Sequence, residues 1–294
     1  MSILLGVLEE GFIYAILALG VYITYSILDF PDLSVDGTFP LGAVITASLI
    51  LLGVPALITL PLSFLAGAIA GCITGLIHVK LKVRDLLSGI IMMTALYSVN
   101  LVLAGDKANL PIFSSETIFD NHYFESPMFQ KISEYLPVII TFLLVIIVKF
   151  LMDEYFKTRS GYLLKAVGDN EVLVTSLGKD KGFVKIVGLS LANGLVALAG
   201  SIYCQRHGFF EVTIGTGSIV IGLASVIIGT KVVKQFYNVK GTTAVIFGSI
   251  FYKACVAMAI SLGMRASYLK FITALLFLVI LVLGSGKKKK VGGN

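Results

Sequence analysis

The stretch 156–185, FKTRSGYLLKAVGDNEVLVTSLGKDKGFVK, is one of two long polar segments in a very apolar chain. Apolar runs of membrane-spanning length lie on both sides of it. Leucine and valine recur within it at roughly helical spacing, and Gly161, Gly168, Gly178 and Gly182 interrupt the pattern. The segment therefore predicts a loop that contains a short helix and binds a partner. The alternative is a plain connecting loop with a solvated face.

The composition places the rest of the chain in a membrane. Hydrophobic residues make up 57% of the 294 residues and charged residues only 14%, too few to cover the surface of a soluble domain. Runs of about 20 apolar residues recur along the whole length. They predict an all-α fold, a polytopic bundle of transmembrane helices that forms a single domain over residues 1–294. The start of the chain, MSILLGVLEEGF, has no basic residue, so we expect the first span to be retained.

About nine apolar segments are expected to cross or enter the membrane. They cover about 11–28, 39–52, 56–79, 86–104, 135–152, 184–203, 214–230, 241–262 and 269–284. Basic residues concentrate near 80–84, 157–185, 231–240 and 287–290, which the positive-inside rule places in the cytoplasm. The loop at about 105–134 is acidic on balance and is placed outside. An odd number of spans with a cytoplasmic C-terminus puts the N-terminus outside.

The segment 39–52 is too short to cross the bilayer as a regular helix. Its roughly 14 residues would give about 21 Å of helix against about 30 Å of hydrocarbon. DFPDLSVDGTFP precedes it and predicts a broken or re-entrant element. Carboxylates near hydrocarbon are costly unless they face protein or water, so Asp32, Asp36 and the adjacent Gly37 are candidates for lining the translocation pathway. The alternative is that the carboxylates cap the following helix at the membrane interface.

A second interruption has the same order of residue types. EVTIGTGSIVIGLA at 211–224 and DLSVDGTFPLGA at 32–43 both run acid, aliphatic, hydroxyl, aliphatic and then glycine before an apolar helix. The helices that follow are expected to run in opposite directions, which is typical of an inverted repeat with the pathway between its halves. Glu211, Gly215 and Gly217 are therefore further pathway candidates.

Small and amide side chains predict how the helices pack. Gly67, Gly71 and Gly75 lie four residues apart, a spacing that lets another helix approach the backbone closely. Asn100 and Asn193 lie within or at the ends of spans, where a buried amide needs a partner. We expect both amides to join helices; lining of the pathway is the alternative, for which Asn100 is kept as a candidate.

The chain carries no recognisable catalytic or cofactor motif. GSGKKKK at 284–290 lacks the residues that complete a phosphate-binding P-loop, and we interpret it as a basic tail at the lipid surface. His78, His122 and His207 are far apart and lack metal-ligand spacing. We therefore expect a transport subunit that is no enzyme and binds no cofactor, with ATP and Mg²⁺ on a separate chain if transport is active.

Three stretches resemble, in the same order, permeases of the branched-chain amino-acid and ribose type ABC importer family. They are GFIYAILALGVYITYSILDFPDLSVDGTFPLGA at 11–43, GYLLKAVGDNEVLVTSLG at 161–178 and GTGSIVIGLASVIIGT at 215–230. A fourth, DLLSGIIMMTALYSVNLVLAGDKANLPIF at 85–113, is similar to a subgroup of uncharacterised permeases often assigned to tryptophan or tyrosine uptake. The chain lacks the Asn-Phe-Ala-His element of branched-chain members, so a branched-chain substrate is not expected.

The resemblance implies an importer of a small organic solute, an amino acid with an aromatic one favoured, in the bacterial cell membrane. Two permease copies, as a homodimer or with a related permease, would form the pathway above a cytoplasmic ABC ATPase dimer. An extracytoplasmic substrate-binding lipoprotein would deliver the solute to the outside loops 105–134 and 204–213. The cytoplasmic loop at about 153–183 would carry the coupling helix. Its expected ATPase contacts are Leu164, Ala166, Gly168, Asn170 and Glu171.

The alternative from another class is a secondary, ion-coupled transporter that works without an ATPase. It would need ion-coupling residues in mid-membrane, for which Asp32, Asp36 and Glu211 are the candidates. Reconstitution of the chain alone separates the two hypotheses, because uptake without ATP supports only the secondary transporter. A channel or a structural membrane subunit is a weaker alternative.

Overall fold

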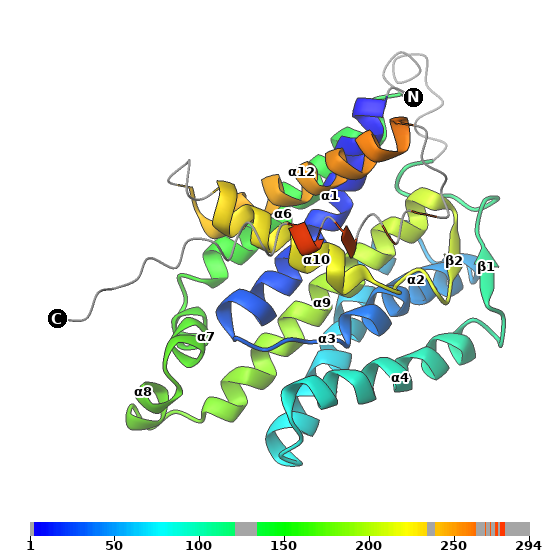
Figure 1. The fold of residues 1–294 in the computed structure, drawn as a ribbon. Coiled ribbons are helices and arrows are strands. Elements are labelled where there is room, and N and C mark those ends of the chain that lie inside the picture. Colours follow the sequence, from blue (N-terminus) through cyan, green and yellow to red (C-terminus); the bar gives the residue numbers. More distant parts are fainter. Residues whose placement is uncertain are drawn as a thin grey trace.

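The computed structural model describes residues 3–120, 134–233 and 239–262, with a few residues between 268 and 279. It is a bundle of helices whose connecting segments lie at the two opposite ends of the bundle (Figure 1). The helices are α1 (Ile3–Val21), α2 (Val35–Leu51), α3 (Ala56–Lys80), α4 (Asp85–Leu103), α6 (Leu136–Tyr155), α7 (Arg159–Asp169), α8 (Glu171–Ser176), α9 (Lys181–His207), α10 (Ser218–Ile227) and α12 (Gly241–Ser261). The π-helical turns η1 (Tyr22–Ile27) and η3 (Ile228–Val233) continue α1 and α10.

The described part of the chain contains six helices that are long and apolar enough to cross a membrane. They are α1 with η1, α3, α4, α6, α9 and α12; α2 and α10 are shorter apolar helices. Each of the first eight segments expected from the sequence therefore contains a helix, with bounds that differ by several residues. Most of the ninth expected segment, 269–284, lies outside the described residues. The all-α, multi-pass prediction is confirmed at this level.

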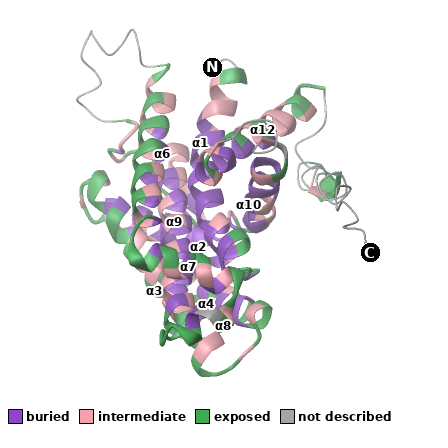
Figure 2. Cartoon of the chain, turned by 90° about the vertical axis from the view of Figure 1, so that its left-hand side faces the viewer, coloured by how far each residue is buried: buried purple, intermediate pink, exposed green. Residues whose placement is uncertain are grey.

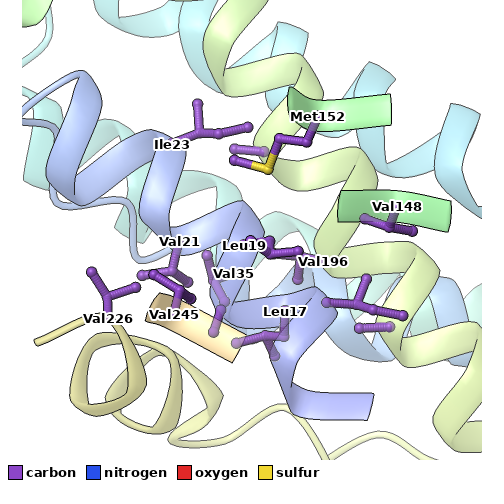
Figure 3. Close-up of a cluster of buried hydrophobic side chains, with 14 of the residues drawn as sticks. Leu17, Leu19, Val21, Ile23, Val35, Val148, Met152, Val196, Val226 and Val245 are labelled. Carbon is purple, nitrogen blue, oxygen red and sulfur yellow. The ribbon is translucent and has the colours of Figure 1, made fainter. Parts of the chain in front are cut away.

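Helices α1 and α9 form the centre of the bundle. In the most apolar 18-residue stretch of each of these two helices, 61% of the residues are buried. The corresponding share is 28–33% in α3, α4, α6 and α12. Figure 2 shows the buried residues concentrated along the middle helices. In Figure 3, Leu17 of α1 packs in a cluster with Val148 of α6, Val196 of α9 and Val245 of α12. The peripheral helices expose large apolar side chains, as helices that face lipid do.

A glycine seam joins α3 to α9. A Cβ added to Gly71 would overlap the carbonyl of Leu189, and one added to Gly67 would overlap the carbonyl of Asn193. Close backbone approach of this kind maximises van der Waals contact between membrane helices, where lipid removes the hydrophobic driving force. The close packing predicted from the glycine spacing is confirmed.

The connections gather at two ends of the bundle. At one end, which we call the α7 end, Lys82 and Arg84 line the same hollow as Lys181 and Lys185. Lys240 reaches this end as well, because its ammonium lies 3.1 Å from the carboxylate of Asp153 at the end of α6. All three basic connections described by the structure therefore lie together.

The opposite end, which we call the β end, carries a small sheet that the sequence did not predict. Strands β1 (Asn109–Pro111) and β2 (Phe209–Glu211) pair antiparallel, with Asn109 opposite Glu211. Gln205 of α9 donates a hydrogen bond to the Thr59 hydroxyl at 3.0 Å and accepts one from the Ile118 amide at 3.1 Å. These contacts hold the loop after α4 against α3 and α9.

Candidate functional site

Two interruptions of the helical structure meet inside the bundle. A non-helical segment, 28–34, separates η1 from α2, and residues 212–217 separate β2 from α10. Asp36, in the first turn of α2, accepts hydrogen bonds from the main-chain amides of Gly217 at 2.9 Å and Ile219 at 2.8 Å. The hydroxyl of Ser218 donates to the same carboxylate at 3.2 Å. Asp36 thus caps the N-terminus of α10, where a negative charge is most favourable.

Glycine is required on the α10 side of this contact. Gly217 has φ +88°, a left-handed conformation that a side chain disfavours. A Cβ on Gly215 would overlap the main-chain carbonyl of Asp36. Asp36, Gly215 and Gly217 were predicted separately from the sequence, and the structure brings them together. We call residues 32–38 and 215–219, together with Asn193, the helix-break site.

A buried carboxylate ties the first break to α9. Asp32 is 1% exposed and accepts hydrogen bonds from the Ser34 amide at 2.9 Å and the Asn193 side-chain amide at 2.8 Å. The Asn193 carbonyl in turn accepts from the hydroxyls of Thr38 at 2.7 Å and Ser34 at 3.1 Å. Among the described residues no cation pairs with Asp32, so neutral donors alone satisfy this carboxylate.

Asn100 links α4 to the first break. Its amide donates to the Gly37 carbonyl at 3.1 Å, which agrees with the expectation that it joins helices. Its own side-chain oxygen is buried and accepts no hydrogen bond from the described residues. Gly37 lies against Leu96 of α4, where an added Cβ would come within 2.9 Å of the leucine Cβ. The first break is therefore packed tightly on two sides.

Glu211 does not join the helix-break site. It lies on β2, and its carboxylate accepts a hydrogen bond from the Thr213 hydroxyl at 2.5 Å. Ser34, Thr38 and Asn193 were missing from the predicted pathway residues. A signal for the two hydroxyls was present, since Ser34 and Thr38 are four residues apart and lie on one face at the start of α2, next to the segment that carries Asp32.

The polar loop that opened the sequence analysis folds as two short helices rather than one. The Thr158 hydroxyl accepts a hydrogen bond from the Gly161 amide at 3.2 Å and caps α7. The Asn170 side chain accepts from the Val172 amide at 3.0 Å at the start of α8. Asn170 therefore caps the N-terminus of α8.

The two helices of this loop have an inner and an outer face. Leu164 is fully buried and its side chain lies against Gly188 of α9, whereas a Cβ on Gly168 would overlap the Ile27 carbonyl of η1. Ala166 is half-buried and Asn170 is exposed. Large apolar side chains are exposed on α7, on α8 and in the turn after α8: Tyr162 at 63%, Val172 at 76% and Leu177 at 62%. We call these three side chains with Asn170 the α7–α8 face.

Glu171 is occupied by cations of its own chain. Its carboxylate lies 2.8 Å from the ammonium of Lys181 and also pairs with Lys185. Hydrogen bonds from Lys181 and then Lys185 lower the pKa of the Glu171 carboxyl to about 2. These pairs hold α8 against the first turn of α9.

Comparison with known proteins gives one family and several relatives. Residues 3–282 match the model of the family described as "Branched-chain amino acid transport system / permease component". The chain is 42% identical over 285 residues to the tyrosine transport system permease protein of Clostridioides difficile, which covers 97% of this chain and 92% of that protein. It is 32% identical over 286 residues to the uncharacterized protein RP368 of Rickettsia prowazekii, covering 96% and 97%. It is 28% identical over 230 residues to the ribose import permease of Escherichia coli K12, covering 77% and 68%. No solved structure matches the chain.

Proposed function

This chain belongs to the family of branched-chain amino acid transport permeases, and from that premise we propose that it imports an aromatic amino acid. It is a multi-pass ABC permease rather than an enzyme, which favours the ABC hypothesis over the secondary-transporter alternative. The observation that carries the amino-acid proposal is the 42% identity, over 97% of this chain, to a protein described as a tyrosine permease. The absence of the Asn-Phe-Ala-His element agrees with a substrate that is not branched-chain.

The helix-break site is the proposed centre of the pathway. Where the N-termini of two interrupted helices meet inside a bundle, their free main-chain amides and nearby carboxylates can bind a solute. The first interrupted element joins α1 to α2, and the second joins α9 to α10. Helix α2 leads to the β end, where Ser48 bonds the Leu103 carbonyl at 2.9 Å, whereas α10 leads to the α7 end. This opposite course supports the proposed inverted repeat within a single permease domain, 1–294.

The pathway residues we propose are those of the breaks and their neighbours. They are Asp32, Asp36, Gly37, Asn100, Gly215 and Gly217, with Glu211 nearer the β end. Asn100 contributes a buried carbonyl oxygen that has no donor among the described residues. An acceptor of this kind is costly to bury. It would gain a partner if the bundle rearranged during transport.

We place the α7 end in the cytoplasm and the β end outside the bacterial cell membrane. The clustering of basic connections at the α7 end supports this orientation through the positive-inside rule. The α7–α8 face would then dock in an ABC ATPase, which holds ATP and Mg²⁺. The β end would meet a substrate-binding lipoprotein, and two copies of the chain would enclose the pathway.

The assignment is tested by purification and reconstitution. The tagged permease, extracted in mild detergent, should bring down a P-loop ATPase and a solute-binding lipoprotein in comparable amounts. Proteoliposomes that contain all three proteins should take up tyrosine only when ATP is present on the side of the membrane that carries the ATPase. Uptake by the permease alone without ATP would contradict the proposal, and so would an assembled transporter that ignores aromatic amino acids.

The docking surface has its own test. Val172→Asp and Leu177→Asp place charges on exposed positions, so the permease should fold while ATP hydrolysis loses its response to the binding protein. Thr175→Asp is a matched control beside them, because Thr175 is exposed but already polar and should leave coupling largely intact. Normal coupling in the Val172 and Leu177 variants would assign docking to another surface.

A further inference from the structure

A group of charged side chains joins α1, α9 and α12 toward the β end. Lys253 of α12 lies 3.1 Å from the carboxylate of Glu10 of α1, and His207 of α9 lies 2.8 Å from the same carboxylate. Arg206 of α9 pairs with Glu9 of α1. We call these five residues the charge cluster. Neither the family match nor the helix-break site accounts for it.

The charge cluster lies at the edge of the apolar spans: Lys253 is inside the run 241–262, and the other four residues lie just beyond the runs 11–28 and 184–203. All five residues belong to helices that are apolar enough to span the membrane. Ionised side chains at such places face protein or a water-filled cavity rather than lipid. The Glu9 side chain is only 6% exposed, but those of Glu10, Arg206 and His207 are each about 30% exposed. One side of the cluster is therefore buried and the other is open.

The charges of the cluster are separated but balanced. Glu9 and Glu10 supply two negative charges from α1, while Arg206 and Lys253 supply two positive charges from other helices. These four charges sum to zero. A ligand with one cationic and one anionic group could exchange these internal pairs for its own contacts without leaving an uncompensated charge in the site.

An aromatic layer lies directly beside the charges. The Lys253 ammonium lies 3.6 Å from the centroid of the Tyr14 ring, and the His207 ring lies 4.1 Å from that of Tyr203. Phe39 of α2 stacks on Tyr14 at 5.9 Å and meets Tyr203 edge-on at 5.5 Å. Phe39 follows Asp36 by one turn of α2, so the aromatic layer leads from the charge cluster to the helix-break site.

We propose that the charge cluster is a recognition site for the zwitterionic head group of an amino acid as it enters the pathway. Lys253 and Arg206 bind the carboxylate, and Glu10 binds the ammonium group. When Lys253 turns to the carboxylate it leaves the face of the buried Tyr14 ring, and the side chain of the ligand then lies against Tyr14 and the half-buried Tyr203, which suits an aromatic residue. This inference rests on the proposed function and adds to it a site in the permease itself that selects the substrate class.

The test uses the assembled transporter with its ATPase and binding protein in proteoliposomes. Lys253→Gln and Glu10→Gln should each lower tyrosine uptake about tenfold or more, since each removes a charge-assisted bond to the ligand. ATP hydrolysis stimulated by the binding protein should persist, because docking is untouched. The control is Lys149→Gln on α6, which removes an ion pair with Asp153 inside one helix and away from the charge cluster, and it should keep uptake within about twofold of wild type.

The exchange variant Glu10→Lys/Lys253→Glu separates recognition from a structural clamp. A clamp is restored when the two charges change places, whereas a head-group site is not, because ammonium and carboxylate would meet like charges. Restored uptake in the exchange variant, or uptake within twofold of wild type in both single variants, would overturn the proposal. A wild-type transporter that moves no amino acid would instead overturn the proposed function, and this inference with it.

A photolabelling experiment tests the same site in the wild-type transporter, so it does not depend on whether the variants fold. Wild-type transporter is irradiated with p-azidophenylalanine, an aromatic amino acid that keeps both head-group charges, and the labelled peptides are mapped. Label on the peptides of Tyr14 or Tyr203, displaced by excess tyrosine, supports the site. Label that is confined to other helices would overturn it.

Discussion

The carboxylate of Asp36 lies 2.9 Å from the main-chain nitrogen of Gly217, although 181 residues separate them. This contact makes one unit of the two interrupted elements, because the start of α2 supplies the cap that α10 lacks in its own sequence. The free energy of that cap is available only while the two elements stay together. A rearrangement of the pathway that separates α2 from α10 must break it.

Asp36→Ala should lower the free energy of unfolding by about 1–2 kcal/mol, the usual cost of losing an N-cap. It should also reduce ATP-dependent uptake, since α10 would no longer be held against α2. Thermal unfolding in detergent, followed by far-UV circular dichroism, measures the first effect; tryptophan fluorescence is not an option because the chain has none. Asp36→Asn, which keeps one acceptor, should lose less. An equal loss in both variants would show that charge matters more than capping.

Asn193→Ala should destabilise the permease by about 1–3 kcal/mol or more, because it leaves the buried Asp32 carboxylate and two hydroxyls without their shared partner. Asn193→Asp should be worse, since it places a second carboxylate beside Asp32. The double change Asp32→Asn/Asn193→Asp should recover much of the loss by restoring one acid and one amide. Thermal unfolding of the four proteins gives the answer, and failure of the double change to recover stability would contradict the network.

Gly71→Ala should separate α3 from α9, because the added Cβ overlaps the Leu189 carbonyl. Overpacking of this kind costs about 1–3 kcal/mol. Gly6→Ala is the matched control, since a Cβ on Gly6 meets nothing within 4 Å. The expected result is a lower unfolding temperature for the Gly71 variant only. Equal unfolding temperatures would mean that the seam is looser than the structure has it.

Glu171→Gln should lower the stability of the α7–α8 loop at pH 7. The pKa of Glu171 is lowered from 4.5 to about 2 by Lys181 and Lys185, so the contribution of these pairs is fully present above about pH 4.5 and is lost as the pH falls through about 2. The side chain is 40% exposed, so solvent screening limits the effect to about 0.5 kcal/mol. Hydrogen exchange of α8 amides in wild type and variant should differ at pH 7 and converge near pH 2. A difference that grows on acidification would contradict the assignment.

The helices could be predicted from the sequence because the bilayer sets their length. Apolar runs such as 56–79 and 241–262 match α3 and α12 closely, since both ends of a span must reach polar surroundings. The breaks could also be predicted, because Asp, Gly and Pro interrupt apolar runs only where the backbone can find other partners. Strands of three residues, as in β1 and β2, are too short to show a period of two.

The partners of the break residues could not be predicted. The sequence marked Asp36 and Gly217, but the bond between them depends on how α1 and α9 pack in the centre of the bundle. The face of α7 that packs against the bundle was also not predicted. Gly161, Leu164 and Val167 recur every three residues, a spacing typical of a buried stripe. Leu164 and Gly168 therefore attach the loop to the bundle, and the α7–α8 face stays exposed.

The packing of Gly168 on the Ile27 carbonyl has a mechanical consequence. Ile27 ends η1, and only the short segment 28–31 separates it from Asp32. A displacement of α7 toward or away from the bundle is thus delivered to the backbone directly before the first break, without a relay through several helices. A bulky residue at 168 would press on the Ile27 carbonyl from the other side, so this contact, together with the packing of Leu164 on Gly188 of α9, limits how far α7 can move before the membrane part of the protein must follow.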